Sequence, residues 1–329
     1  MTGAVLELKG LETEFDTRDG IVRAVDKVSY EVGKGETLGV VGESGCGKSV
    51  TSLSILRLIP NPPGRIAAGE ILYGGEDLTK VSETRIREIR GNEISMIFQE
   101  PMTSLNPMMS VGKQIAEPLI RHRGLSKKAA AEKAEEMLNL VHIPDAGKWL
   151  TGYPHEMSGG MRQRVMIAMA LACDPKVLIA DEPTTALDVT IQSQVLKLIR
   201  GLQEKMGTAV VMITHDLGVI AETADRVVVM YAGRKVEEAN VNELFANPRH
   251  PYTVGLMTAI PRLDKITSDE FNDERLTEIP GVVPPLYDLP QGCAFASRCS
   301  IATDNCRQEK PDFEEKSPGH WAACFEEIN

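Results

Sequence analysis

The sequence has no long apolar run, no excess of positive charge and few aromatic residues. An apolar stretch such as residues 165–173 falls well short of the roughly 18 residues that a membrane-spanning helix needs. The chain carries 36 Lys and Arg against 47 Asp and Glu, whereas nucleic-acid binding requires clustered basic side chains. The acidic residues between Glu7 and Asp16 are atypical of signal and transit peptides. We therefore expect neither a membrane span nor a nucleic-acid partner.

Cysteine is scarce and unevenly placed. Cys46 and Cys173 stand alone, and four cysteines lie together near the end of the chain: Cys293, Cys299, Cys306 and Cys324. Their spacing, C-x5-C-x6-C-x17-C, differs from the paired C-x2-C knuckles of structural zinc sites, and a reducing cytosol disfavours disulfides. Four thiols in a proline-rich segment with few core residues suggest a bound metal that stabilises the fold. Either a [4Fe–4S] cluster or Zn²⁺ fits, with reduced thiols as the remaining alternative.

Short apolar runs alternate with helical patterns along the first three quarters of the chain. The candidate buried strands are residues 37–41, 94–98, 177–181, 209–213 and 227–231. The helical patterns between them include one with apolar residues at 195, 198, 199, 202 and 206. This alternation predicts an α/β fold with a largely parallel sheet.

Three further segments complete the expected organisation. Residues 5–8 and 25–32 alternate between apolar and polar, which suggests an antiparallel β addition. Residues from about 100 to 165 predict a helical insertion, with 127–140 rich in Ala, Glu and Lys. Prolines and cysteines dominate the end of the chain, so we place one domain at 1–247 and a second at 248–329.

A glycine-rich segment follows the first candidate strand. Residues 42–49 read Gly-Glu-Ser-Gly-Cys-Gly-Lys-Ser and match the P-loop, in which glycines let backbone N–H groups turn toward phosphate oxygens. We expect Lys48 to reach the β- and γ-phosphates and the Ser49 hydroxyl to ligate Mg²⁺. The helix that begins there adds its positive dipole end. The candidate nucleotide-binding residues of this segment are Gly42, Ser44, Gly45, Cys46, Gly47, Lys48, Ser49 and Val50.

Two other strands end in polar residues. The run 177–180 leads into Asp181 and Glu182, and the next run leads into His215. Because neighbouring parallel strands end at the same edge of a sheet, we expect these side chains to lie close together. Asp181 would then hold Mg²⁺, Glu182 would polarise an attacking water, and His215 would assist them. A surface acidic pair and a structural histidine are the alternatives.

Residues 157–164, Met-Ser-Gly-Gly-Met-Arg-Gln-Arg, open another predicted helix. Ser158 suits the N-cap position, and the glycine pair lets an anion approach the backbone. The segment resembles the signature motif of ATP-binding-cassette (ABC) ATPases, whose other motifs follow in order over residues 1 to about 245. The resemblance implies a P-loop NTPase core with a RecA-like parallel sheet, an antiparallel β subdomain, a helical subdomain and a small C-terminal extension. Met161 departs from the family, where glutamine is usual.

The resemblance also implies roles for individual residues. Gln99 is similar to the Q-loop glutamine that contacts Mg²⁺, Asp188 to the D-loop aspartate, and His215 to the switch histidine at the γ-phosphate. Phe15 is the candidate for the aromatic ring that stacks on adenine, with Val22 or Arg23 as alternatives.

In ABC ATPases the signature motif of one subunit completes the P-loop site of another. Ser158, Gly159 and Gly160 would therefore contact ATP in a partner, and the active unit would be a dimer that encloses two ATP molecules. Met161 suggests that the two sites are unequal, which favours a second, homologous cassette as the partner. A non-hydrolysing regulatory or scaffold subunit would be expected to lack Lys48, Glu182 or His215, and all are present.

The segments after residue 248 resemble the C-terminal extension of oligopeptide and dipeptide importer ATPases. Those segments are residues 249–253, 279–284, 292–293 and 298–299. The resemblance implies a peripheral subunit at the cytoplasmic face of the cell membrane. There it would hydrolyse ATP to drive peptide uptake through two permease subunits, with cargo delivered by an extracytoplasmic binding protein.

The transported solute and the role of the four cysteines each have more than one interpretation. A different small solute such as nickel, or a soluble ABC ATPase outside transport, would share the cassette motifs. Related peptide-importer ATPases carry a [4Fe–4S] cluster at the four cysteines. The resemblance thus implies a cluster here, with a structural role away from the ATP site.

Overall fold

The computed structural model describes residues 3–18, 20–99, 104–184, 189–259 and 278–328. The strands are β1 (Ala4–Thr17), β2 (Gly20–Gly33), β3 (Thr37–Val41), β4 (Gly64–Tyr73), β5 (Glu76–Asp77), β6 (Ile94–Ile97), β7 (Val177–Asp181), β8 (Ala209–Ile213), β9 (Arg226–Tyr231), β10 (Arg234–Asn240), β11 (Glu314–Ser317) and β12 (His320–Ala322). The helices are α1 (Lys48–Ile55), α2 (Glu83–Ile89), α4 (Val111–Arg123), α5 (Lys127–Leu140), α6 (Ala146–Trp149), the 3₁₀ turn η1 (Pro154–Glu156), α7 (Gly159–Leu171), α8 (Val189–Met206), α9 (Leu217–Thr223), α10 (Val241–Ala246), α11 (Pro251–Thr258) and α13 (Asp304–Gln308).

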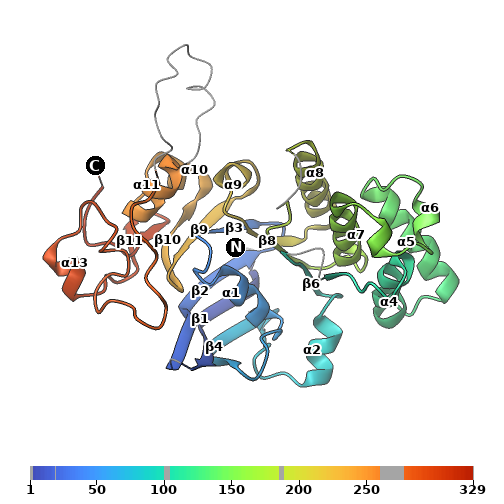
Figure 1. Ribbon diagram of the computed structural model, residues 1–329, viewed down its shortest axis with the longest axis horizontal. Helices are drawn as coiled ribbons and strands as arrows, with labels where there is room; N and C mark the ends of the chain where they lie inside the picture. The colour runs from blue at the N-terminus through green and yellow to red at the C-terminus, as the bar shows by residue number, and fades with distance from the viewer. Residues whose placement is uncertain (1–2, 19, 100–103, 185–188, 260–277, 329) are drawn as a thin grey trace, which may run out of the picture.

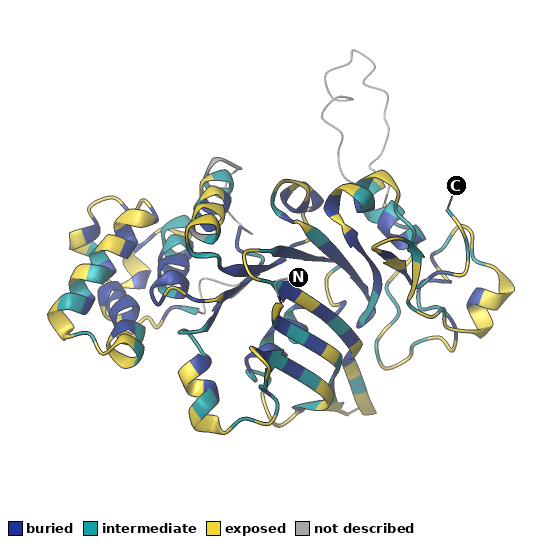
Figure 2. Ribbon diagram, turned by 180° about the vertical axis from the view of Figure 1, so that it is seen from behind, coloured by how far each residue is buried: buried dark blue, intermediate teal, exposed yellow. Residues whose placement is uncertain are grey.

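The larger sheet has the order β11-β12-β10-β9-β3-β8-β7-β6. Strands β9, β3, β8, β7 and β6 run parallel, and every residue of β3, β7 and β8 is buried. Helices cover a parallel sheet on both faces, so its strands read as continuous apolar runs. The five predicted strands and the α/β class are therefore confirmed, and Figure 2 shows the dark, buried strands in the middle of the molecule.

The smaller sheet has the order β2-β1-β4-β5 and is antiparallel. Its long strands β1 and β2 include the two alternating segments predicted from sequence, and their inward side chains, such as Leu6, Leu8 and Val25, are buried. Strand β4 has no clear alternation, because three of its middle residues are exposed. Figure 1 shows this sheet below the P-loop helix α1.

Helices α4, α5 and α7 contribute to one apolar core with the helix-covered face of the large sheet. The range predicted for a helix rich in Ala, Glu and Lys coincides with α5, which begins where the Ser126 hydroxyl accepts a hydrogen bond from Ala129 N at 3.2 Å. In Figure 1 these helices form one end of the molecule. No helix in the described ranges has both the length and the apolar character needed to span a membrane.

The C-terminal residues form the opposite end of the molecule (Figure 1) and extend the large sheet. Strand β12 pairs with β10 through Glu237–Ala322 and Glu238–Trp321. Beneath this pairing, His320 Nε2 lies 2.7 Å from Glu237 Oε1, and both side chains are fully buried. The same carboxylate accepts hydrogen bonds from the backbone of Arg249 and His250, at 2.5 and 3.1 Å. The extension is thus continuous with the sheet that carries the P-loop.

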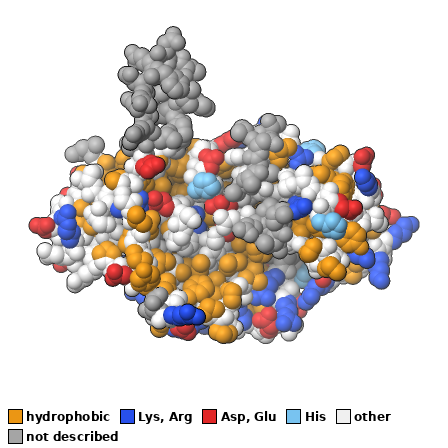
Figure 3. All heavy atoms as spheres, in the orientation of Figure 1, with side chains coloured by type: hydrophobic (Ala, Val, Ile, Leu, Met, Phe, Trp, Pro, Cys, Tyr) orange, Lys and Arg blue, Asp and Glu red, His pale blue; other side chains and the backbone are white. Residues whose placement is uncertain are grey.

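Charged side chains of both signs lie on the face shown in Figure 3. They lie mostly toward its rim, and apolar or uncharged side chains occupy much of its middle.

Candidate nucleotide site

Three adjacent strands of the large sheet deliver the candidate side chains to one edge. Strand β8 lies between β3 and β7. The P-loop follows β3. Strand β7 ends at Asp181, with Glu182 next in the chain, and His215 lies just after β8. Ser49 Oγ donates to Asp181 Oδ1 at 3.1 Å across 132 residues of sequence. The structure therefore brings together the residues that the sequence placed at neighbouring strand ends.

The P-loop adopts a backbone that only glycine tolerates at two points. Gly42 and Gly47 have φ of 149° and 98°. A Cβ atom would lie 2.2 Å from the Met230 carbonyl oxygen at Gly42, and 2.3 Å from the Ala24 carbonyl oxygen at Gly47. Gly47 is also the N-cap of α1, so the unpaired N–H groups of the first helical turn point into the loop.

The other residues of the loop differ in exposure. Ser44 and Gly45 are exposed, Cys46 is buried, and Ser49 and Val50 are half-buried. Burial raises the pKa of the Cys46 thiol, which keeps it protonated. Cys46 therefore fits the interpretation of a small apolar residue, while the exposed part of the loop remains open to a ligand.

The Lys48 side chain is folded back onto the loop. Its Nζ donates to the carbonyl oxygens of Gly42 and Glu43 at 2.6 and 2.9 Å, with Cys46 Sγ at 3.6 Å. Only 6% of Lys48 is exposed. The ammonium group is thus held within the loop by neutral carbonyl acceptors, which phosphate oxygens could replace.

Asp181 and Ser49 form a pair of oxygen donors suited to Mg²⁺, a hard cation that prefers such ligands. Burial raises the pKa of the Asp181 carboxyl, with a smaller contribution from the charge of Glu182, and the Ser49 hydrogen bond opposes the shift. A nearby divalent cation would compensate for this buried charge. Gln99 lies exposed just beyond β6.

Glu182 and His215 face each other beside this pair. Glu182 has a left-handed backbone with φ of 49°, held by a hydrogen bond from its N–H to the Ile213 carbonyl at 2.9 Å. His215 Nδ1 lies 3.3 Å from Glu182 Oε1, and the His215 side chain is 64% exposed. Non-glycine residues in this conformation concentrate at functional sites, where surrounding structure holds the strain.

Ser158 immediately precedes α7. Its hydroxyl accepts a hydrogen bond from Met161 N at 3.3 Å, which makes it the N-cap of the helix. Ser158 and Gly159 are exposed and Gly160 is half-buried. Farther along α7, the buried Gln163 side chain donates to the Pro183 carbonyl, next to Glu182. The signature helix is therefore tied to the strand end that carries the two carboxylates.

The remaining candidate residues are Phe15 and Asp188. Phe15 lies near the end of β1 opposite Val22, half-buried, with its ring against Gly64, where a Cβ would come 2.7 Å from Phe15 Cε1. Its stacking role stays a prediction. Asp188 and the rest of the expected D-loop lie outside the described residues.

Comparisons with known proteins match this arrangement. Residues 25–185 match the ABC transporter family, and residues 236–306 match the C-terminal region of oligopeptide/dipeptide transporters. The chain is 56% identical to a probable peptide ABC transporter ATP-binding protein of Sinorhizobium fredii, over 98% of this chain and 94% of that protein. It is 55% identical to the oligopeptide transport ATP-binding protein OppD of Bacillus subtilis, over 95% and 85% of the two chains. The chain belongs to the ABC transporter ATP-binding family.

Solved structures agree with this assignment of an ABC ATPase. A dimeric ATP-binding cassette in a post-hydrolysis state with ADP and Pi superposes with a TM-score of 0.66 at 28% identity, covering 72% of this chain and 98% of that one. The cassette cbiO1 of Clostridium perfringens, part of the complex cbiONQ, gives 0.61 at 26% identity, with 80% and 97% coverage. The expected ABC cassette fold is confirmed, and with it the ATPase class.

The four C-terminal cysteines of this ABC ATPase line one small cavity of about 20 Å³, together with His250 and Phe295. All are free thiols. Burial raises the pKa of Cys293, Cys299 and Cys324, the last to about 11. Within the described ranges, no group of three or more His, Cys, Asp or Glu side chains is arranged to hold a metal ion. The four cysteines thus line one cavity, but the structure does not bear out the expected metal site in the part of the chain that it describes.

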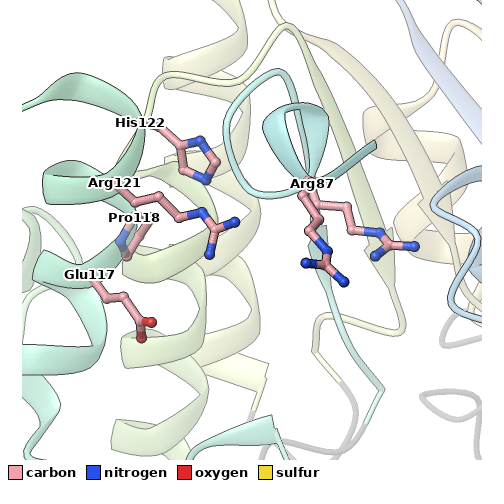
Figure 4. Close-up of a pocket in the computed structure, with 6 residues that line it drawn as sticks. Arg87, Glu117, Pro118, Arg121 and His122 are labelled. Carbon is pink, nitrogen blue, oxygen red and sulfur yellow. The ribbon is translucent and has the colours of Figure 1, made fainter. Parts of the chain in front are cut away.

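The ABC ATPase also has a basic cavity of about 410 Å³ between α2 and α4. Figure 4 shows Arg87 from α2 and Arg121 from α4 directed toward the space between the helices, with His122 beside them. Burial lowers the pKa of His122, assisted by Arg121 and Arg123. The lining residues belong to α2, its C-terminal cap Arg90 and α4, and Gln99 lies between these two helices along the chain.

Two residues of the extension that sequence analysis did not assign to the site contact the P-loop. Tyr252 and Arg298 both bond to Glu43. The sequence offered only a weak signal, since both lie in segments similar to the transporter extension and Arg298 precedes Cys299.

Proposed function

We propose that the chain is the ATP-hydrolysing subunit of an ABC importer that drives uptake of di- or oligopeptides across the cytoplasmic membrane. One observation carries the enzymatic part: Ser49 bonds to Asp181 at 3.1 Å, beside Glu182 and His215 at the mouth of a P-loop. The cargo is supported by the extension, which matches the C-terminal region of oligopeptide/dipeptide transporters, and by relatives whose names refer to peptide import.

The positions of the site residues support the roles that we propose for them. Lys48 leaves the carbonyls of Gly42 and Glu43 and binds the β- and γ-phosphates, together with the N–H groups of the loop. Ser49 and Asp181, with Gln99, would hold Mg²⁺, which neutralises phosphate charge when bound. Glu182 accepts the proton of the attacking water.

His215 acts next to Glu182. Its side chain is exposed and 3.3 Å from that carboxylate, so it orients the water or stabilises charge that develops on the γ-phosphate. Phe15 is the proposed adenine platform, although its ring already packs against Gly64.

The active unit in this proposal is a dimer of cassettes. Ser158, Gly159 and Gly160 of one subunit complete the site of the other, and the exposure of the first two supports such a role. A similar solved cassette is dimeric. Met161 favours a heterodimer with a homologous cassette. Asp188 is the proposed D-loop aspartate.

Two permease subunits and an extracytoplasmic peptide-binding protein complete the proposed importer, with this chain peripheral at the cytoplasmic face of the membrane. We place permease docking beside the segment 99–107. The support is the resemblance of Gln99, which begins this segment, to the Q-loop glutamine that couples the ATP site to membrane partners. Residues 1–247 form the proposed cassette and 248–329 the proposed extension.

The four cysteines are the proposed ligands of a [4Fe–4S] cluster, with Zn²⁺ as the alternative. The support is that all four thiols line one cavity, and that three of them lie within the residues that match the transporter extension. Because thiols must lose protons to bind metal, the raised pKa of Cys324 predicts strong pH dependence of loading. Protein purified without oxygen should be brown and contain about four irons per chain. Stoichiometric zinc without iron would replace the cluster by a zinc site.

A reconstitution experiment tests the whole proposal. The chain is co-expressed with its membrane partners and a second cassette, and uptake of a labelled dipeptide into vesicles is measured with ATP inside or outside. We expect uptake that requires ATP on the cassette side and little hydrolysis by the chain alone. Full, unregulated hydrolysis by the isolated chain, or uptake of nickel but not of peptides, would contradict the proposal.

A further inference from the structure

The C-terminal extension reaches the phosphate-binding loop directly. The backbone N–H of Glu43, the second residue of the loop, donates to the Tyr252 hydroxyl at 2.6 Å. The Glu43 carboxylate accepts two hydrogen bonds from Arg298, from Nη1 at 2.6 Å and from Nη2 at 2.9 Å. These partners lie 209 and 255 residues away along the chain. Glu43 is thus held at its backbone and its side chain by the extension.

Contacts other than those to Glu43 also hold the Arg298 side chain in place. Its Nε donates to the Pro280 carbonyl at 3.0 Å, and its guanidinium also contacts the Ile279 carbonyl and the Tyr231 hydroxyl, each at 3.3 Å. The side chain is only 3% exposed, and it lies against the rings of Tyr231 and Phe295. A planar, fully bonded guanidinium of this kind is a pre-organised partner for one carboxylate.

The position of Glu43 makes this pairing relevant to nucleotide binding. The loop must present N–H groups and the Lys48 ammonium to a polyphosphate, and a carboxylate in the same loop adds a charge of the wrong sign. Arg298 balances that charge and turns the carboxylate toward the extension. The Glu43 carbonyl oxygen also accepts a hydrogen bond from Lys48 Nζ at 2.9 Å. A shift of Glu43 would therefore also move the Lys48 ammonium group.

We propose that Arg298 and Tyr252 are positioning residues of the ATP site, and that the extension sets the affinity of the P-loop for nucleotide. This inference rests on the proposed function, because it takes ATP as the ligand of the loop. It goes beyond the expectation for the four cysteines, whose cluster was expected to have a structural role away from the ATP site. Phe295 packs on Tyr231 and Tyr252 and also lines the cysteine cavity, so the two regions of the extension share one aromatic cluster.

The test uses the full-length chain and a non-hydrolysable ATP analogue with Mg²⁺. Arg298→Met keeps the apolar contacts and removes the charge, and we expect the dissociation constant to rise by about tenfold, as for loss of a charge-assisted pair. Tyr252→Phe removes only the hydroxyl, and a rise of about threefold is expected from loss of one neutral hydrogen bond. Arg307→Ala is the matched control, because the side chain of this arginine of the same extension is 60% exposed and, among the described residues, its ion pair is with Asp304 at 3.5 Å.

A double variant separates positioning from packing. In Arg298→Met/Glu43→Gln the unbalanced carboxylate is gone while the packing of the extension stays altered, so affinity should return to within about threefold of the unmodified chain. In the assembled transporter, the KM for ATP should rise in Arg298→Met with a much smaller change in kcat.

The outcomes are distinct. Unchanged affinity in both Arg298→Met and Tyr252→Phe would overturn the inference, and so would a double variant no better than Arg298→Met, since that result indicates a packing role alone. Lys48→Ala is measured in parallel. If it too left nucleotide affinity unchanged, the proposed function would fail; if it alone abolished binding, only this inference would fail.

Discussion

Glu237 is the residue whose loss we expect to destabilise the junction between sheet and extension most. Its fully buried carboxylate accepts hydrogen bonds from the backbone of Arg249 and His250 and contacts His320 Nε2 at 2.7 Å. Glu237→Ala would leave two backbone donors and a fully buried imidazole without this partner. Each buried polar group left unsatisfied costs about 1–3 kcal/mol. Because Glu237→Ala leaves several such groups at once, we expect a loss of about 3–5 kcal/mol in total.

The assay is urea unfolding followed at the extension and at the whole chain. Fluorescence of Trp321, which neighbours His320 in β12, reports on the extension, while far-ultraviolet circular dichroism reports on the complete fold. We expect the fluorescence transition of Glu237→Ala to move to much lower urea and to separate from the dichroism transition. Trp149 is the only other tryptophan, so the comparison is made in a Trp149→Phe background.

A surface carboxylate of the same extension provides the control. Glu314 pairs with Lys316 at 2.6 Å, but its side chain is 61% exposed, and exposed pairs contribute about 0–1 kcal/mol. Glu314→Ala should therefore unfold almost as the unmodified chain does. The reasoning would be refuted if Glu237→Ala and Glu314→Ala lost the same stability.

Two other predictions concern acid stability and the signature motif. Burial lowers the pKa of His250 to about 4, so the unfolded chain binds more protons between pH 6.5 and 4. Falling pH should then remove up to about 3 kcal/mol of stability. His250→Asn keeps an acceptor for Tyr252 N. In urea unfolding, the stability that this variant loses relative to the unmodified chain should be smaller at pH 4.5 than at pH 7. An equal deficit at both pH values would contradict the assignment. Ser158→Ala should lower ATP hydrolysis by the assembled transporter at least about tenfold without weakening nucleotide binding. Ser126→Ala removes an equivalent N-cap from α5 and should change only stability, so equal rates for both variants would exclude Ser158 from the site.

Much of the parallel core was predictable from sequence because burial on both faces leaves an unmistakable pattern. Strands β3, β7 and β8 have the bounds predicted from the sequence. The juxtaposition of Ser49 with Asp181 and of Glu182 with His215 follows from the rule that neighbouring parallel strands end at one edge. Local chemistry and periodicity were sufficient for this part of the candidate site.

The rest depends on polar contacts that leave no periodic signal. Strand β10 reads as a charged segment, yet its Glu237 is fully buried because His320 and two backbone N–H groups satisfy it. The Arg298–Glu43 pair spans 255 residues, and neither residue type nor spacing indicates the partner of the other. The left-handed backbone of Glu182 is likewise a product of the surrounding sheet.

The most direct test of the account is the effect of Glu182→Gln on the assembled transporter. This change keeps the size of the side chain and removes the group that accepts the proton of the attacking water. We expect ATP hydrolysis to fall by about 10²–10⁴-fold and peptide uptake to stop, while the affinity of the full-length chain for nucleotide is retained. Lys48→Ala, measured alongside, should lose that affinity. Hydrolysis by Glu182→Gln at a rate close to that of the unmodified transporter would contradict the assignment of the catalytic base, and with it the proposed mechanism.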